Sequence, residues 1–127
     1  MGRSTSSRVA QPLLVSGSAA SRTGGTLALE TIAAGSLSLL VSTTIVTGSL
    51  VATFKPQVSN DNVNWFDVKP SNNAAFVTFT ATGTACLSLA DLTGWKLFRV
   101  VATLTGASVA AGDLTECTYV YRKFGSA

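Results

Sequence analysis

Acidic side chains are the first candidates for chemistry in this chain, because it contains no histidine. The absence of imidazole excludes the common Ser-His and Cys-His nucleophile pairs and a histidine base. Among the six acidic residues, Asp61 and Asp67 lie close in sequence and could flank a hairpin, as the paired carboxylates of a glycoside hydrolase do. A role in a turn explains Asp61 more simply. We therefore predict no catalytic residues and a protein that is not an enzyme.

Metal ligands are equally sparse. Cys86 and Cys117 lack a Cys-x-x-Cys spacing, so a zinc site is not expected. The run Asn60-Asp61-Asn62 offers oxygen ligands for calcium, but the spacing and the further carboxylates that calcium needs are missing. We predict no metal and no cofactor, and we expect both cysteines to be buried free thiols. A disulfide would require the two strands to be neighbours, which the sequence leaves open.

Aromatic side chains provide a different possibility, a sugar-binding platform. Four of them could stack on a sugar: Trp65, Trp95, Tyr119 and Tyr121. Three asparagines could hydrogen-bond to it: Asn60, Asn62 and Asn72. However, Trp65 adjoins Phe66 in a strand pattern and Trp95 opens another, and large aromatics at such places are more often part of a core. A carbohydrate-binding module is kept as an alternative.

These residues must be positioned by short strands, of which Ser49 to Val68 is the clearest example. Alternate residues of its first half are apolar and share one face: Leu50, Ala52, Phe54, Pro56 and Val58. The polar run from Ser59 to Asn62 then predicts a tight turn, and a second strand is expected from Val63 to Val68. We predict that Leu50, Phe54, Val58 and Trp65 belong to the core.

The rest of the chain continues as a series of strands with frequent turns. The expected strands are Thr26–Ile32, Leu37–Val46, Ala74–Thr82, Thr84–Leu89, Trp95–Leu104 and Leu114–Phe124. The third and fourth of these are expected to pair as a hairpin, and Ser88 to Gly94 predicts at most one helical turn. The fold class is therefore all-β, a single antiparallel β-sandwich or jelly-roll-like barrel over residues 26–127.

Residues 1–25 differ from this pattern and predict an extended basic N-terminal arm. Their charged residues are Arg3, Arg8 and Arg22, which account for the net charge of +3. The arm is either a solvated leader or a segment that orders on a neighbouring subunit. Three arginines without interleaved aromatics do not indicate direct nucleic-acid binding. No apolar run approaches the roughly 18 residues of a membrane span, and we expect synthesis in the cytoplasm.

Composition sets a further expectation about partners. The 127 residues suit one domain, but only 12% of them are charged whereas 46% are hydrophobic. A surface with so few charges is poorly protected against association. One interpretation is that other protein chains cover much of the exterior, and the other is that Thr, Ser and Asn alone keep it polar.

Two stretches resemble segments of small β-sandwich virion proteins of tailed bacteriophages. They read FKPQVSNDNVNWFDV and LTGWKLFRVVATLTGASVAAGDLTECTYVYRKF. The shared features are a strand that ends in Gln-x-Ser-Asn-Asp with a Trp after the turn, a Gly-Trp strand entry, an arginine in the penultimate strand and an aromatic final strand. This chain has Asp61-Asn62 where Asp-Gly is commoner, a change that Asn tolerates because it accepts positive φ.

The resemblance implies a capsid cement or decoration protein, bound to the major capsid protein on the virion surface and forming a homotrimer. A tail or neck component of the same virion is the alternative within this class. We expect the capsid contacts to involve the arm through Arg22 and exposed edge strands, with Arg3, Arg8, Arg22, Arg99 and Arg122 as candidate partner-binding residues. Deletion of residues 1–25 is then expected to abolish particle binding and leave the domain folded.

Overall fold

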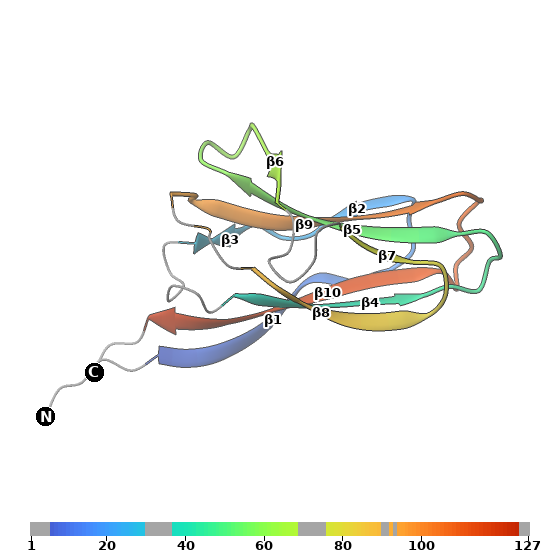
Figure 1. Ribbon diagram of the computed structural model, residues 1–127, viewed down its shortest axis with the longest axis horizontal. Coiled ribbons are helices and arrows are strands. Elements are labelled where there is room, and N and C mark those ends of the chain that lie inside the picture. The colour runs from blue at the N-terminus through green and yellow to red at the C-terminus, as the bar shows by residue number, and fades with distance from the viewer. Residues whose placement is uncertain (1–5, 30–36, 69–75, 90–91, 93, 125–127) are drawn as a thin grey trace, which may run out of the picture.

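The chain folds into two facing antiparallel β-sheets (Figure 1). The structure is a computed structural model that describes residues 6–29, 37–68, 76–89, 92 and 94–124. At residues 6–16 and 122–124 the description is limited to the backbone. The described residues form ten strands and almost no helix, so the prediction of an all-β sandwich is confirmed. In this part of the chain, no helix has the length and apolar character needed to cross a membrane.

One layer is a four-stranded sheet in the order β1-β10-β4-β8. Its strands are β1 (Ser6–Gly17), β10 (Leu114–Phe124), β4 (Ser38–Thr44) and β8 (Gly83–Ser88). The other layer follows the order β2-β9-β5-β6, with β3 also paired to β9 and β7 to β5. Its strands are β2 (Ser21–Thr23), β9 (Leu97–Thr105), β5 (Val51–Ser59), β6 (Phe66–Asp67), β3 (Leu27–Ala28) and β7 (Val77–Phe79).

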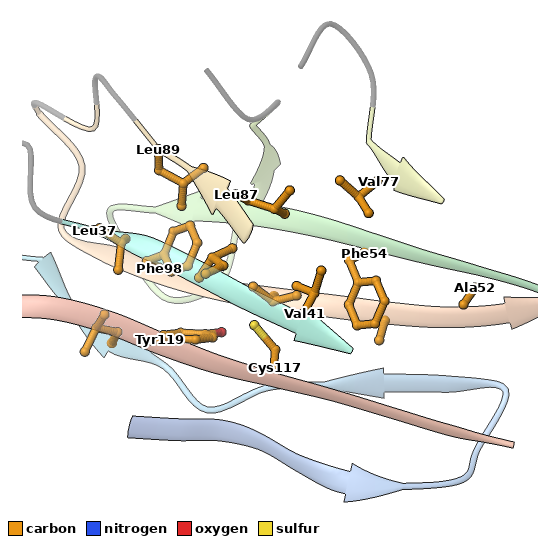
Figure 2. Packing of buried hydrophobic residues seen from close by; sticks show 14 of the residues in the cluster. Leu37, Val41, Ala52, Phe54, Val77, Leu87, Leu89, Phe98, Cys117 and Tyr119 are labelled. Carbon is orange, nitrogen blue, oxygen red and sulfur yellow. The ribbon is translucent and has the colours of Figure 1, made fainter. Parts of the chain in front are cut away.

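The core lies between the sheets and follows the alternation seen in the sequence. On β5 and β9 every second residue is buried, and on β10 the same is true of Cys117, Tyr119 and Tyr121. Phe98 and Tyr119 pack edge to face across the two layers, with ring centroids 5.4 Å apart (Figure 2). Such aromatic pairs stabilise a core beyond the area they bury. The predicted inward face of β5 is thus confirmed, and β9 and β10 bury their side chains with the same two-residue period.

The predicted hairpin between residues 74–82 and 84–89 is wrong. β7 pairs with β5 in one sheet, whereas β8 pairs with β4 in the other, so the chain crosses between the layers after Phe79. Both strands still bury an apolar side chain in the core, Val77 from one side and Leu87 from the other. Alternation is satisfied equally well in either sheet, and that is why it did not identify the crossing. Of the helical turn expected at 88–94, residues 90, 91 and 93 lie outside the described chain.

Residues 6–23 are paired into both sheets. β1 pairs with β10 along almost its whole length, and β2 pairs with β9. β1 therefore satisfies backbone groups of β10 that would otherwise form an open edge. Its register shifts between Pro12 and Leu14 and again before Gly17, and these irregularities interrupt the two-residue period by which strands are identified. The division of the chain into an arm over residues 1–25 and a domain over residues 26–127 stays a prediction.

Candidate partner-binding surface

The five predicted partner-binding arginines do not form one site. Arg3 lies outside the described residues. Arg8 and Arg122 are register partners on β1 and β10, which brings two basic residues together at one edge of the four-stranded sheet. Arg22 and Arg99 lie on the other sheet, on β2 and β9, and their surroundings differ sharply.

Arg22 is engaged inside the sandwich. From β2 its Nη1 donates to the carbonyl of Gly17 at 3.2 Å and to both the carbonyl and the hydroxyl of Thr115 on β10. A Cβ atom at Gly17 would lie only 2.9 Å from Arg22 Nη2, so the glycine leaves room for the guanidinium. The side chain therefore joins the two sheets, and a partner would have to compete with these internal acceptors.

Asp113 lies beside this contact, at the entry to β10. Its carboxylate is fully buried and accepts hydrogen bonds from the Thr47 hydroxyl and from the backbone N–H groups of Val46, Thr47 and Ala110. These bonds, the Thr47 hydroxyl foremost, hold the pKa of Asp113 well below its usual range although desolvation opposes them. We refer to Gly17, Arg22, Thr47, Asp113 and Thr115 as the β10-entry cluster.

Arg99 lies on the outer face of the six-stranded sheet, in a row that crosses three strands. Its Nε donates to Gln57 Oε1 at 2.8 Å, and Gln57 Nε2 donates to Asp67 Oδ1 at 2.9 Å. The three residues are register partners on β9, β5 and β6. The guanidinium carbon lies 4.1 Å from the ring centroid of Trp65, which is a cation–π contact. We refer to Trp65, Arg99, Gln57 and Asp67 as the Arg99 row.

The core assignment of Trp65 is therefore wrong. Trp65 is half-buried, and its ring packs beneath Arg99 on the exterior of the sheet. Trp65 precedes Asp67 by two residues and therefore shares its outer face, and the end of the β5–β6 hairpin bends away from the opposite sheet (Figure 1). The second strand of the hairpin is accordingly reduced to Phe66–Asp67. Leu50, Phe54 and Val58 are buried as predicted.

The turn that carries Trp65 is organised by Asp61. Its carboxylate accepts from the backbone N–H groups of Asn64 and Val63 and from the Asn64 side chain, and these bonds lower the pKa of Asp61. Asn62 has φ +61°, the left-handed conformation predicted for this turn. The turn is tied to the start of β9 because Asn60 Oδ1 accepts from Lys96 N at 2.9 Å. Asp61 therefore shapes the loop, as its turn interpretation predicts.

Apolar side chains are exposed at the end of the β5–β6 hairpin. Phe66 is 54% exposed and Val63 77% exposed. Phe66 is the register partner of the buried Val58 and therefore lies on the opposite face of the sheet from the Arg99 row; its ring contacts Trp95 at a centroid distance of 5.6 Å. On the outer face, Lys55 precedes Gln57 by two residues on β5 and lies 5.4 Å from the ring centroid of Phe76. Two cations held on aromatic rings, Arg99 and Lys55, thus share the outer face of this sheet.

The remaining candidates for chemistry are explained by burial. Tyr119 and Tyr121 are core residues, so neither can form a sugar platform. The Tyr119 hydroxyl is buried without a hydrogen-bond partner among the described residues, and burial raises its pKa. Cys117 is buried as predicted, and desolvation raises the pKa of its thiol to about 12. Both cysteines are free, but Cys86 is exposed on the outer face of β8, which corrects the prediction that it is buried.

Sequence reasoning missed most of the Arg99 row. Arg99 was selected as a basic residue of a strand, but Gln57 and Asp67 were not linked to it. Strand alternation places Gln57 outward on β5, yet the register that aligns it with Arg99 is a long-range property. The described residues contain no cluster of three or more His, Cys, Asp or Glu side chains suited to a metal ion.

Comparisons with known protein families, with curated proteins and with solved structures found no match.

Proposed function

We propose that this chain is a structural virion protein of a tailed bacteriophage, a capsid cement or decoration protein that binds the major capsid protein. The support comes from the resemblance of its Phe54–Val68 and Leu92–Phe124 segments to such proteins and from its sandwich fold. The observation that carries the proposal is the Arg99 row on the outer face of the six-stranded sheet. It presents positioned donors and the half-buried ring of Trp65 to the exterior, and arginine and aromatic side chains are enriched in protein-recognition surfaces.

Self-association into a trimer is part of the proposal. The outer face of β4 and β8 is formed by uncharged side chains, including the exposed Leu40, which is 40% accessible, and its register partner Cys86. Ser42 and Thr84 continue this face and hydrogen-bond to each other across the strands. A flat sheet face without charges costs little to desolvate against another copy. We expect this face, rather than the Arg99 row, to lie between copies.

The test is whether the protein purifies with an icosahedral particle and in how many copies. Hundreds of copies per particle in a lysate of the producing phage would support a shell protein, and a few copies would support the tail or neck alternative. Purified particles that contain no copies of this chain would contradict both. Deletion of residues 1–25 does not serve as the test, because it removes β1 and β2 from the sandwich.

Carbohydrate binding is a second candidate, favoured by the placement of Trp65 outside the core. One face of its ring is covered by Arg99, which leaves at most the other face for a sugar. A glycan array with the wild-type protein and a folded Trp65→Ala variant tests this function. Glycan binding that is lost in the variant would support the sugar-binding alternative, and an absence of glycan binding by the wild type would eliminate it.

A further inference from the structure

The geometry of Arg99 points to a specific recognition chemistry. Its guanidinium is held from two directions, by the Trp65 ring below at 4.1 Å and by the Nε bond to Gln57 Oε1 at 2.8 Å. Gln57 is itself oriented by its bond to Asp67. A planar group with its face and one edge fixed has lost most of its rotational freedom before any ligand arrives. The side chain is therefore pre-organised.

The opposite edge of this guanidinium is unused. Among the described residues, neither Nη1 nor Nη2 of Arg99 has a hydrogen-bond acceptor. The nearest acid of the row, Asp67, is bonded to Gln57 and not to Arg99. The two Nη groups form a fork whose spacing matches the two oxygens of a carboxylate. An external carboxylate could thus be bound bidentately without displacing an internal partner.

The neighbouring side chains indicate what carries that carboxylate. Lys55 lies on the same face of β5 as Gln57, because the two are separated by one residue, and it adds a second cation held on an aromatic ring. This surface has two cations, Arg99 and Lys55, and one acidic residue, Asp67. Its net charge is therefore positive and favours an anion.

We propose that the Arg99 row and Lys55 form the docking surface for an acidic segment of a partner protein, in which an Asp or Glu carboxylate occupies the Arg99 fork. Two cations are too few for a nucleic-acid backbone, whose binding depends on many phosphate contacts. The inference rests on the proposed function only in identifying the partner as the major capsid protein.

The experiment titrates the ¹⁵N-labelled chain with a blocked peptide of alternating Glu and Leu, and with the same peptide carrying Gln in place of Glu. The readouts are the Arg99 Nε–H signal and tryptophan fluorescence. We expect the Glu peptide to shift both signals and to bind about tenfold more weakly to Arg99→Gln, a loss of the size expected for one charge-assisted contact. Lys96→Gln, which removes an exposed cation outside the row, is the matched control and should bind as the wild type does.

Three outcomes would overturn the inference. They are equal binding of the Glu and Gln peptides, unchanged binding by Arg99→Gln, and tighter binding of an oligo-dT strand than of the Glu peptide. The same variants in a capsid co-sedimentation assay separate this inference from the proposed function. Capsid binding that survives Arg99→Gln would leave the function standing and refute the docking surface. Arg99-dependent peptide binding without capsid binding would support the docking surface and refute the function.

Discussion

The β10-entry cluster and the Arg99 row are built from similar types of residue, yet they differ in burial and in how completely their polar groups are hydrogen-bonded. Each contains one arginine, one aspartate and uncharged polar side chains. In the cluster, Asp113 and Thr115 are buried and bonded to segments distant in sequence. In the row, Asp67 is exposed and Arg99 only half-buried, and the guanidinium is held at Nε while its Nη groups have no acceptor in the described chain.

The difference shows how a polar group comes to stabilise a fold or to remain available for binding. Inside a protein, an unpaired polar group costs far more than on the surface, so buried groups are retained only with their partners. At the surface, water replaces a missing partner at little cost, and a donor can be kept free. The number of acceptors around each arginine, rather than its charge, therefore separates Arg22 from Arg99.

The largest expected effect comes from removing the segment that contains two of the five residues of the β10-entry cluster. Deletion of residues 1–25 takes away Gly17 and Arg22 and also exposes the edge of β10 and part of the edge of β9. We expect no cooperative thermal transition in circular dichroism. Deletion of residues 1–5 retains both strands and serves as the control. A truncated chain that melts within about 5 °C of the wild type would show that the fold does not need residues 1–25, as the prediction of a separate arm requires.

Arg22→Met should have the next largest effect. The variant keeps an apolar stem but leaves the Thr115 carbonyl and hydroxyl and the Gly17 carbonyl without their shared donor. Buried groups left unsatisfied typically cost about 1–3 kcal/mol, so we expect a loss of about 2 kcal/mol in urea unfolding. Labelling of the buried Cys117 should also become faster, with Cys86 as the internal standard for an exposed thiol. An unchanged free energy of unfolding would show that Arg22, like Arg99, contributes little to the stability of the fold.

Asp113 should make the stability of the protein depend on pH. Its pKa is lowered in the folded state by the bonds from Thr47 and its neighbours, so the folded chain binds this proton less readily than the unfolded chain. The stabilisation is complete above the usual aspartate pKa of about 4 and is lost as pH falls below it. Thermal melts between pH 7 and pH 2.5 measure this loss.

Asp113→Asn should lower the melting temperature at pH 7 by about 5 °C or more, because an amide NH₂ would face N–H and O–H donors. The acid dependence of the variant should also be weaker. Asp61→Asn is the matched comparison, since Asn caps the same turn and the site is exposed. Its melting temperature should fall by less than half as much. Equal losses in the two variants would show that burial does not distinguish these carboxylates.

Much of the fold follows from alternation in the sequence, but the pairing does not. The inward faces of β5, β9 and β10 are legible because Phe54, Phe98 and Tyr119 recur at two-residue spacing with other apolar residues. The same pattern also contained the answer for Cys86, since the buried Leu87 and Leu89 place Cys86 on the opposite side of the strand. The prediction that Cys86 is buried is wrong because it rests on the usual burial of free cysteines, whereas the position of Cys86 in the strand places it outward.

The remaining errors concern information that is absent from local patterns. β1 contains Pro12 and two register shifts, so its assignment depends on the neighbouring β10. Trp65 is predicted in the core because large aromatic residues in strands usually are, but the register that aligns Asp67 with Gln57 puts Trp65 on the outer face. The Arg99 row requires the register of three strands at once. Candidate sites that combine residues of several strands are therefore the hardest part of a sandwich to predict from sequence, because strand register is not encoded in local patterns.

Arg99→Met should have the smallest effect on stability. It tests whether Arg99, unlike Arg22, is dispensable for the fold. Its guanidinium contributes one bond to Gln57 and one cation–π contact at a half-buried site, contributions that together are worth about 1 kcal/mol or less. We expect urea unfolding to change by no more than this, while the emission of Trp65 changes because its ring loses the cation above it. Arg22→Met, measured in the same buffer, supplies the contrast. If Arg99→Met destabilised the chain as much as Arg22→Met, Arg99 would be a structural residue, and its free Nη edge would lose its significance for binding.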